Sequence, residues 1–379
     1  MKVLIAGGGT GGHVFPGIAV AEELRAHHPG VEVLFIGGRR GIEATAVPEA
    51  GFRLRTLLTA GFPRRRWWRW PWAALVNVAG LVQAFLILLT ERPRVVLGTG
   101  GYVSGPVSFA ARALGIPLLL QEQNSIPGLT NRLLSRIANE VHLSFLEARS
   151  HFPRRDHLKV TGNPVRSYIL SGDREPALRD FKLSVGKPTL FVFGGSLGAK
   201  RITAAAVDAL RRLKGRVDVQ CILQTGREEY EAVRATVAAE QLPATVLPFV
   251  KKMHLAYAAA DLVVCRAGAM TLAEIAVCGR PSILIPYPYA AHDHQRVNAQ
   301  NLADRGAAVV IEDAELDGER LAREVAHLLA DRTLLSRMSA NARLFARPDA
   351  AARLARSLVS WAEGRKGEAP AETLVEEGE

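Results

Sequence analysis

Short runs of aliphatic and β-branched residues recur along the whole chain, each followed by a turn and then by a helical pattern. Such runs are typical of strands buried on both faces, and their alternation with helices predicts parallel sheets with crossover helices. The predicted strands cover residues 3–6, 33–36, 95–97, 117–120, 189–193, 219–223, 262–264 and 282–285. The pattern therefore predicts the α/β fold class.

These strands form two sets, because a glycine-rich turn follows the first strand at residues 7–12 and the fifth at residues 194–199. Each set predicts a doubly wound, Rossmann-like domain. Turn residues around Gly162-Asn163-Pro164 place the boundary near residue 163. We expect an N-terminal domain, a C-terminal domain, a helix that packs back toward the N-terminal domain, and an acidic, disordered tail, over residues 1–163, 164–348, 349–363 and 364–379.

Composition narrows the class of protein. With 379 residues, 48% hydrophobic and 22% charged, the chain is long and apolar enough for two folded domains, which excludes general disorder. Three cysteines without a CxxC pair make disulfides and structural zinc unexpected. The formal net charge of +11 favours anionic partners: nucleic acid, acidic lipid or phosphorylated substrates.

One apolar segment, residues 73–89, approaches the length of a membrane span. Asn77 and Gln83 interrupt it, and Glu91-Arg92-Pro93 end it. We expect a buried or interface-facing helix rather than a span. No secretory signal is expected at the N-terminus, since the first strand runs directly into glycines.

Glycine turns at strand ends are the first candidate binding features. Residues 7–12 precede a helix, so that backbone N–H groups and the helix dipole can face an anion, although the spacing is neither a dinucleotide fingerprint nor a Walker A motif. His13 lies beside this turn as a candidate base, or as a cap or packing residue. A second glycine turn, residues 98–106, and the polar segment 121–124 are expected at the same sheet edge. Turns without any ligand are the alternative.

In the second half, Gly268 precedes a helix predicted from Ala269 to Cys278 and ended by Gly279. The N-terminus of this helix is a candidate phosphate site. Glu274, one to two turns further, is placed to accept two hydrogen bonds from a ribose diol, or is an ordinary surface glutamate. His292 and His294 are too isolated to predict a metal site.

Residues 62–72 hold four of the five tryptophans beside four arginines. This composition is typical of an anchor at the headgroup level of an anionic membrane, and we expect Arg65, Trp67, Trp68 and Trp70 to contact it. Stacking on single-stranded nucleic acid and packing on the protein body are the alternatives.

Six motifs occur here in the order seen in the MurG family of peptidoglycan glycosyltransferases, and this chain resembles that family from residue 1 to about 360. The motifs are Gly8-Gly9-Thr10-Gly11-Gly12-His13-Val14-Phe15-Pro16, Gly100-Gly101-Tyr102-Val103-Ser104-Gly105-Pro106, Glu122-Gln123-Asn124, Gly162-Asn163-Pro164-Val165-Arg166, Gly194-Gly195-Ser196-Leu197-Gly198-Ala199 and Arg266-Ala267-Gly268-Ala269-Met270-Thr271.

The resemblance implies a GT-B fold, two Rossmann-like domains facing a cleft, and an inverting transfer of N-acetylglucosamine (GlcNAc) from UDP-GlcNAc to the C4 hydroxyl of lipid I, which forms lipid II. It implies neither metal nor cofactor. The implied partners are the two substrates, the anionic cytoplasmic face of the inner membrane, where the protein is peripheral, and cell-wall synthesis proteins, but no nucleic acid.

Carried over by position, the resemblance implies three sets of site residues. The donor contacts are Thr10, Gly11, Gly12, Asn124, Arg166, Ser196, Val250, Ala269, Met270, Thr271, Leu272, Ala273, Glu274, Gln295 and Asn298. The acceptor's pyrophosphate is expected at Gly9, Gly101, Tyr102 and Ser104. The catalytic candidates are His13 and Glu122, because many members carry a histidine where this chain has Gln121.

Two rival functions stay open at this point. One is another GT-B transferase, such as one that glycosylates diacylglycerol. The other is a nucleotide-binding module that recruits partners to a membrane without catalysis.

Overall fold

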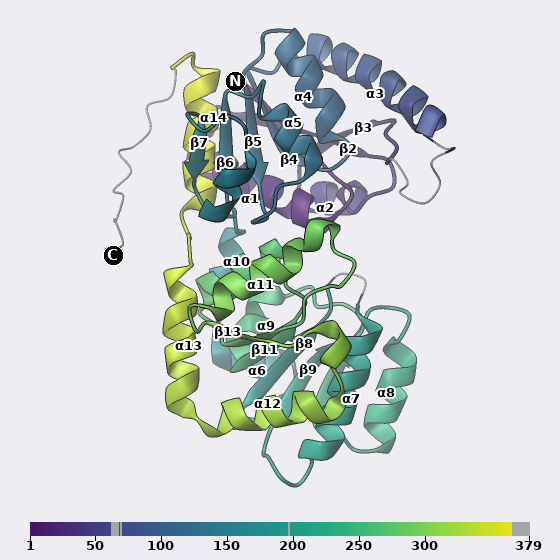
Figure 1. Cartoon of the computed structure of the whole chain (residues 1–379), viewed down its shortest axis with the longest axis vertical. Helices are drawn as coiled ribbons and strands as arrows, with labels where there is room; N and C mark the ends of the chain where they lie inside the picture. The colour runs from purple at the N-terminus through teal and green to yellow at the C-terminus, as the bar shows by residue number, and fades with distance from the viewer. Residues whose placement is uncertain (62–67, 69, 196–197, 366–379) are drawn as a thin grey trace. The chain divides into compact units, whose positions relative to one another are not determined.

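The structure is a computed structural model that describes residues 1–61, 68, 70–195 and 198–365. The chain divides into two compact units, each built on one parallel sheet with helices on both faces (Figure 1). Unit 1 comprises residues 1–123, 127–164 and those from 349 onward, and unit 2 comprises residues 124–126 and 165–348. Arg65, Trp67, Ser196 and the acidic tail from residue 366 lie outside the described residues.

The sheet of unit 1 has seven parallel strands in the order β3-β2-β1-β4-β5-β6-β7. The order reverses between β1 and β4, where Val3 pairs with Val95. In doubly wound sheets such a reversal opens a crevice at the carboxyl ends of the two strands. The strands are β1 (Lys2–Gly7), β2 (Glu32–Gly38), β3 (Arg53–Leu57), β4 (Val95–Gly100), β5 (Leu118–Glu122), β6 (Glu140–Leu143) and β7 (Leu158–Val160).

Alternate residues of β1 face different helices. Val3 and Ile5 belong to a core with α1, α2 and α14, whereas Leu4 and Ala6 belong to a core with α3 and α4. Both faces of the sheet are thus buried, which explains why its central strands are continuously apolar. The helices of unit 1 are α1 (Gly11–His27), α2 (Glu43–Glu49), α3 (Trp70–Glu91), α4 (Ser104–Ala113), α5 (Leu129–Leu134) and α14 (Ala350–Ala362), with a 3₁₀ helix η2 (Leu146–His151).

The sheet of unit 2 has six parallel strands in the order β10-β9-β8-β11-β12-β13, with its reversal between β8 and β11. The strands are β8 (Thr189–Phe193), β9 (Gln220–Gln224), β10 (Ala244–Leu247), β11 (Leu262–Cys265), β12 (Ser282–Leu284) and β13 (Ala308–Val310). The helices are α6 (Arg174–Asp180), α7 (Lys200–Leu213), α8 (Tyr230–Ala239), α9 (Met253–Ala259), α10 (Ala269–Cys278), α11 (His294–Ala303), α12 (Gly318–Ala330) and α13 (Arg332–Leu344), with 3₁₀ helices η3 (Ser167–Ser171), η4 (Ala291–Asp293) and η5 (Asp313–Glu315).

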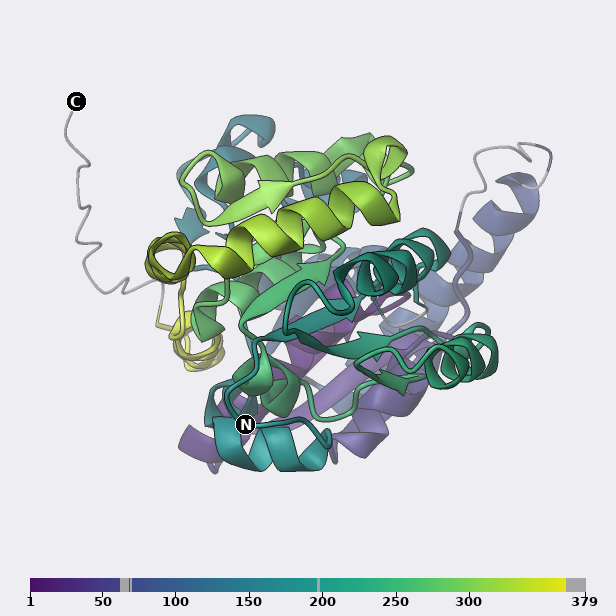
Figure 2. The same cartoon turned by 90° about the horizontal axis from the view of Figure 1, so that it is seen from below.

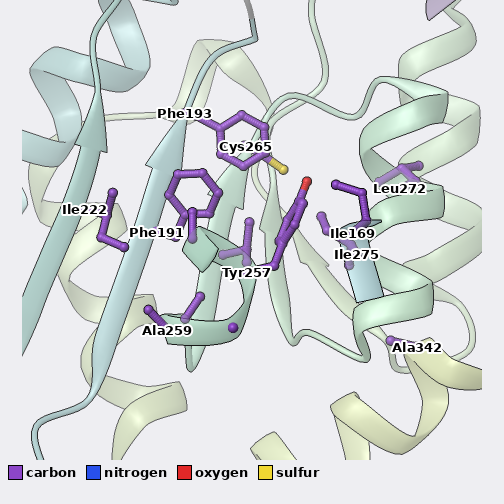
Figure 3. Packing of buried hydrophobic residues seen from close by; sticks show 14 of the residues in the cluster. Ile169, Phe191, Phe193, Ile222, Tyr257, Ala259, Cys265, Leu272, Ile275 and Ala342 are labelled. Carbon is purple, nitrogen blue, oxygen red and sulfur yellow. The ribbon is translucent and has the colours of Figure 1, made fainter. Parts of the chain in front are cut away.

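Each face of this second sheet has its own core. On one face α7 and α12 pack side by side (Figures 1 and 2). On the other face Phe191 and Phe193 of β8 stack at 4.6 Å between ring centroids, and Tyr257 of α9 meets Phe191 edge-on (Figure 3). Tyr257 is fully buried, so its hydroxyl needs a partner inside the unit.

All eight predicted strands are confirmed, and the helix predicted to begin at Ala269 ends at Cys278 with Gly279 in the left-handed conformation. The strands that the pattern missed are mostly sheet edges: β3, β7, β10 and β13, together with β6. β3 and β7 carry charged residues, β10 is only half-buried, and Glu140 and His142 interrupt β6, so none of these four strands shows a continuous buried apolar run. β13 is apolar throughout, and the pattern missed it.

The apolar segment predicted as a helix is α3. By length and composition alone it is the one helix in the described part of the chain that is suited to cross a membrane. It packs against α4 and buries Ala73, Gly80, Ala84 and Leu88. Both interrupting polar residues hold the segment after β3: the Asn77 side chain exchanges hydrogen bonds with the backbone of residue 60, and that of Gln83 accepts one from residue 58. Much of the remaining apolar surface of α3 is exposed.

Candidate active site

Two glycine turns meet at the strand reversal of unit 1. Gly100 and Gly101 have φ of +101° and +80°, which strongly favours glycine. A Cβ atom on Gly101 would lie 2.3 Å from the carbonyl oxygen of Gly8, and one on Gly100 would lie 2.8 Å from Nδ1 of His13. The turns after β1 and β4 are therefore in direct contact, as the sequence predicted for one edge of the sheet.

His13 lies in the first turn of α1, between these two turns. Its Nδ1 atom is 3.1 Å from the Thr99 carbonyl oxygen and 3.1 Å from Oε1 of Gln123. Both partners are acceptors, so Nδ1 carries the ring proton and Nε2 carries the lone pair. This tautomer is the one in which Nε2 can accept a proton.

A chain of buried amides sets the orientation of Gln123. Its Nε2 donates to the Thr99 carbonyl at 2.7 Å and to Oε1 of Gln121. Gln121 in turn donates to Ser144 at 3.1 Å and Asn163 at 3.2 Å. Gln121 is fully buried, so its side chain contacts Gln123 inside the unit and does not face solvent.

Glu43 was not predicted, yet its carboxylate lies beneath the first glycine turn. It is 1% exposed and accepts the Gly9 N–H at 3.0 Å and the Gly38 N–H at 2.8 Å. No motif marks it, because it follows a different strand and meets Gly9 only through the fold. The Gly9 amide is thus directed inward, which argues against its use for the acceptor's pyrophosphate.

Three other predicted residues of unit 1 have distinct placements. Glu122 is 2% exposed and accepts hydrogen bonds from the Gly128 N–H at 3.2 Å and Asn131 Nδ2 at 2.9 Å, so its carboxylate anchors a loop. Ser104 is fully buried, which argues against a ligand contact through its hydroxyl. Tyr102 is exposed. Of the two catalytic candidates, His13 has the more suitable placement.

In unit 2, the N-terminus of α10 follows β11 at the strand reversal. The first hydrogen bond of the helix runs from Leu272 N to Gly268 O at 3.0 Å. The N–H groups of Ala269, Met270 and Thr271 therefore precede the helical ladder, and a helix dipole adds positive potential there. This geometry suits an anion, as predicted.

Glu274 is not an ordinary surface glutamate. It is 7% exposed, Tyr257 donates to its Oε2 at 3.0 Å, and Nη2 of Arg166 lies 3.7 Å from its Oε1. Burial raises the pKa of Glu274, against the opposing effect of Arg166 and Tyr257. The structure brings Arg166 and Glu274 together as two predicted donor contacts, and adds Tyr257, which no sequence signal indicated.

The glycine turn of unit 2 is held by a glutamine. Gln224 at the end of β9 donates to the Gly195 carbonyl at 2.8 Å and accepts the Val250 N–H at 2.8 Å. For the predicted donor contact, the Val250 backbone can therefore use its carbonyl, because its N–H is already bound by Gln224. Gly198 has φ of +81°, and a Cβ atom there would lie 2.1 Å from the Thr225 carbonyl oxygen.

The segment 124–126 groups with unit 2 through α11. The Ser125 N–H donates to Oδ1 of Asn298 at 3.0 Å, and Asn298 Nδ2 donates to Oδ1 of Asn124 at 3.4 Å. Asn298 is fully buried, so its amide holds the predicted donor contact Asn124 in place. Gln295 on the same helix accepts the Tyr287 N–H at 3.0 Å.

The remaining predicted residues lie at the first glycine turn and near the start of α3. Thr10 is exposed at the start of α1, and Gly11 and Gly12 form its first turn, beside His13. Trp70 at the start of α3 is 51% exposed, and Trp68, which precedes the helix in sequence, is 62% exposed. Within the described ranges, no three His, Cys, Asp or Glu side chains gather as a metal-binding group.

Comparison with known proteins relates these features to a family. The glycosyltransferase family 28 N-terminal domain matches residues 3–143, and the glycosyltransferase family 28 C-terminal domain matches residues 189–354. The chain belongs to glycosyltransferase family 28. The two matched regions contain the two glycine turns and α10, so the family covers both candidate binding regions.

Curated relatives resemble the chain over nearly its whole length. A protein of Chlorobaculum parvum is 47% identical over 365 residues, covering 95% of this chain and 99% of its own. One of Moorella thermoacetica is 46% identical over 356 residues, covering 92% and 96%. Both are named UDP-N-acetylglucosamine–N-acetylmuramyl-(pentapeptide) pyrophosphoryl-undecaprenol N-acetylglucosamine transferase.

Solved structures agree with this assignment. The crystal structure of Acinetobacter baumannii MurG matches with a TM-score of 0.74 and 32% identity, covering 95% of this chain and 99% of that chain. A UDP-N-acetylglucosamine 2-epimerase matches with a TM-score of 0.71 at 14% identity, which shows the shared fold alone. The predicted GT-B fold and the predicted family are both confirmed.

Proposed function

We propose that this transferase moves GlcNAc from UDP-GlcNAc to the C4 hydroxyl of lipid I, with inversion, and so forms lipid II for peptidoglycan synthesis. The observation that carries the proposal is the near-full-length identity of 46–47% to relatives named for this transfer. Unit 2 binds the nucleotide sugar and unit 1 binds the lipid-linked acceptor. The residues at the two strand reversals supply chemistry suited to each task.

His13 is the general base of this reaction. Its Nδ1 proton is held by Thr99 and Gln123, so Nε2 takes the proton of the acceptor hydroxyl as that oxygen bonds to C1 of GlcNAc. The bond between C1 and the diphosphate breaks with its electron pair, and UDP leaves. Neutral imidazole is abundant near pH 7, which suits this role.

The leaving diphosphate is stabilised by protein groups without a metal ion. The N–H groups of residues 269–271 and the dipole of α10 stabilise the negative charge that develops on the leaving diphosphate. Glu274, supported by Tyr257, accepts the ribose hydroxyls of the donor. Arg166 lies beside Glu274 and adds positive charge to the same region.

The first test measures transfer directly. Purified protein is incubated with labelled UDP-GlcNAc and a short-chain lipid I analogue in EDTA, with diacylglycerol as a parallel acceptor. We expect UDP and a disaccharide product with lipid I alone. Product with diacylglycerol alone would indicate a glycolipid synthase, and UDP-GlcNAc binding without any turnover would indicate a non-catalytic module.

We also propose that the protein is peripheral on the anionic cytoplasmic face of the bacterial inner membrane. Trp68, Trp70 and Trp72 are exposed, and Leu75, Val82, Leu86 and Leu89 continue an exposed apolar stripe along α3. The net charge of +11 favours an anionic surface. Trp side chains at a basic surface are typical of interfacial anchors.

Vesicle sedimentation tests this attachment. With anionic phospholipid vesicles, we expect the double variant Trp68→Ala/Trp70→Ala to lose binding about tenfold or more. Tyr289→Ala in unit 2, where the side chain is 79% exposed, is the matched control and should bind as the wild type does. Equal binding by all three proteins would rule out this anchor.

A further inference from the structure

Arg166 and Glu274 form a charged pair in the proposed donor site of unit 2. Nη2 of Arg166 lies 3.7 Å from Oε1 of Glu274, which is longer than the about 2.7–2.9 Å of a normal charge-assisted hydrogen bond. The pair alone therefore does not fix the orientation of the guanidinium. The side chain of Arg166 is only 15% exposed, so the groups packed against it set its position.

Tyr168 lies against the guanidinium of Arg166. The Cζ atom of Arg166 is 4.9 Å from the centroid of the Tyr168 ring. A guanidinium within about 6 Å of an aromatic ring centroid is attracted by the negative face of the ring, and more strongly where water is excluded. Both side chains are half-buried, so water screens this attraction only in part.

His254 in turn packs against the ring of Tyr168. The two rings meet nearly at right angles, with 5.3 Å between their centroids and 88° between their planes. Their backbones are close as well, because a Cβ atom on Gly172, which follows η3, would lie 2.3 Å from the carbonyl oxygen of His254. The 3₁₀ helix η3, which carries Tyr168, is thus docked on the start of α9.

One helix, α9, therefore supports both members of the charged pair. His254 and Tyr257 are three positions apart on α9, and this spacing places side chains on the same face of a helix. Tyr257 donates directly to Glu274 at 3.0 Å. His254 contacts Tyr168, which lies against Arg166. All five residues belong to unit 2, so the arrangement is internal to one unit.

We propose that Tyr168 is a positioning residue for donor binding, whose ring holds the Arg166 guanidinium beside Glu274, and that His254 fixes this ring. The inference rests on the proposed function, because the charged pair acts on a donor only if unit 2 binds UDP-GlcNAc. Neither Tyr168 nor His254 needs to touch the substrate. Position matters here because the planar guanidinium recognises an anionic ligand through its location and its angle.

The test measures binding of UDP-GlcNAc to the whole protein by isothermal titration calorimetry, without an acceptor. Tyr168→Leu removes the aromatic face and should weaken the affinity about three- to fivefold, the range of one cation–π contact. Tyr168→Phe keeps the ring and should lose much less. Leu170→Ala, at a 54% exposed position of the same 3₁₀ helix, is the matched control and should bind as the wild type does.

An Arg166→Gln background distinguishes positioning from a general effect on the fold. Arg166→Gln by itself should weaken UDP-GlcNAc binding, because it removes the positive charge. Adding Tyr168→Leu should then cause no further loss, since the group that the ring positions is gone, and the departure from additivity measures the coupling. His254→Leu should give a smaller loss, which also disappears in the Arg166→Gln background. Circular dichroism checks that each variant is folded.

The outcomes separate the two proposals. If the wild type does not bind UDP-GlcNAc, the proposed function fails. Wild-type affinity in Tyr168→Leu, or an equal loss in Tyr168→Leu and Tyr168→Phe, would overturn the positioning role while leaving the transfer intact. A loss that persists undiminished in the Arg166→Gln background would also overturn it, because Tyr168 would then act without Arg166. Full affinity in Arg166→Gln alone would show that Arg166 does not act on the donor, and would overturn the inference as well.

Discussion

The two units share a sheet architecture but hold their glycine turns by different means. In unit 1, the buried carboxylate of Glu43 accepts the Gly9 N–H, and Nδ1 of His13 faces the Thr99 carbonyl and Oε1 of Gln123. In unit 2, Gln224 holds the Gly195 carbonyl, and the free N–H groups at the start of α10 follow the neighbouring strand. A carboxylate inside a turn occupies N–H donors of that turn, whereas a helix N-terminus leaves its first N–H groups outside the helical ladder. In the proposed function, the same fold serves proton transfer in one unit and phosphate binding in the other.

The largest expected effect is on the base of unit 1. His13→Ala should lower kcat about 10²–10⁴-fold, because general base catalysis contributes on that scale. The affinity for UDP-GlcNAc should stay unchanged, since the donor binds mainly in unit 2. Steady-state kinetics measures kcat, and isothermal titration calorimetry measures the affinity for UDP-GlcNAc. A fall in donor affinity with unchanged kcat would reverse the roles that we assign to the two units.

The next largest effect is a loss of stability, expected when one glycine is replaced in a turn of each unit. Gly101→Ala and Gly198→Ala each add a Cβ atom at positive φ, 2.3 Å and 2.1 Å from a carbonyl oxygen. Each should destabilise its unit by about 2–4 kcal/mol, measured by chemical denaturation. Gly115→Ala, with φ of +72° but no atom within 4 Å of the added Cβ, is the control and should lose less.

Those two variants should also differ in kinetics. Gly101→Ala should raise the KM for the acceptor, and Gly198→Ala the KM for UDP-GlcNAc, because each turn serves a different substrate. If both variants changed the KM values for the acceptor and for UDP-GlcNAc equally, the assignment of one substrate to each unit would be wrong.

A smaller effect is expected at the donor's ribose site. Tyr257→Phe removes the hydroxyl that donates to Glu274 at 3.0 Å. The affinity for UDP-GlcNAc should fall about fivefold, the equivalent of roughly 1 kcal/mol for one hydrogen bond. The acceptor KM is the internal control. Full donor affinity in Tyr257→Phe would show that Glu274 needs no such support.

The smallest effect concerns two buried acids with opposite pKa shifts. Burial disfavours the ionised form of Glu140 in unit 1, but the hydrogen bonds with His142 and Lys159 outweigh it and lower its pKa to about 2. Its stabilising contribution is present above the ordinary value of 4.5 and is lost as the pH falls toward 2. In unit 2, burial raises the pKa of Glu274, so its contribution grows as the pH falls through that raised value.

Denaturation at pH 5 and pH 3.5 checks these signs. Between these pH values, Glu140→Gln should lose about 1 kcal/mol less stability than the wild type. Glu274→Gln should lose at least as much as the wild type, since it lacks the compensating proton uptake. An unchanged pH dependence in Glu140→Gln would mean that its ion pair does not stabilise unit 1.

Residues near one another in sequence made part of the site predictable. The glycine turns, the helix from Ala269 to Cys278 and the position of His13 follow from a buried strand, a glycine run and a helical pattern in succession. Glu274 follows from its distance along that helix. Contacts between distant residues were not predictable, because no local pattern marks either partner.

What the sequence by itself determined is the location of the central strands along the chain, the glycine turns and the family motifs, since continuous apolar runs and glycine shape the backbone locally. The tertiary structure decided the edge strands β3, β7 and β10, which show no continuous buried apolar run. It also decided the chemistry of His13, because its tautomer depends on Gln123, 110 positions away. The carboxylate of Glu43 beneath Gly9 and the hydroxyl of Tyr257 against Glu274 arise in the same way. Buried polar groups must find partners within the folded chain, and the fold alone brings those partners together.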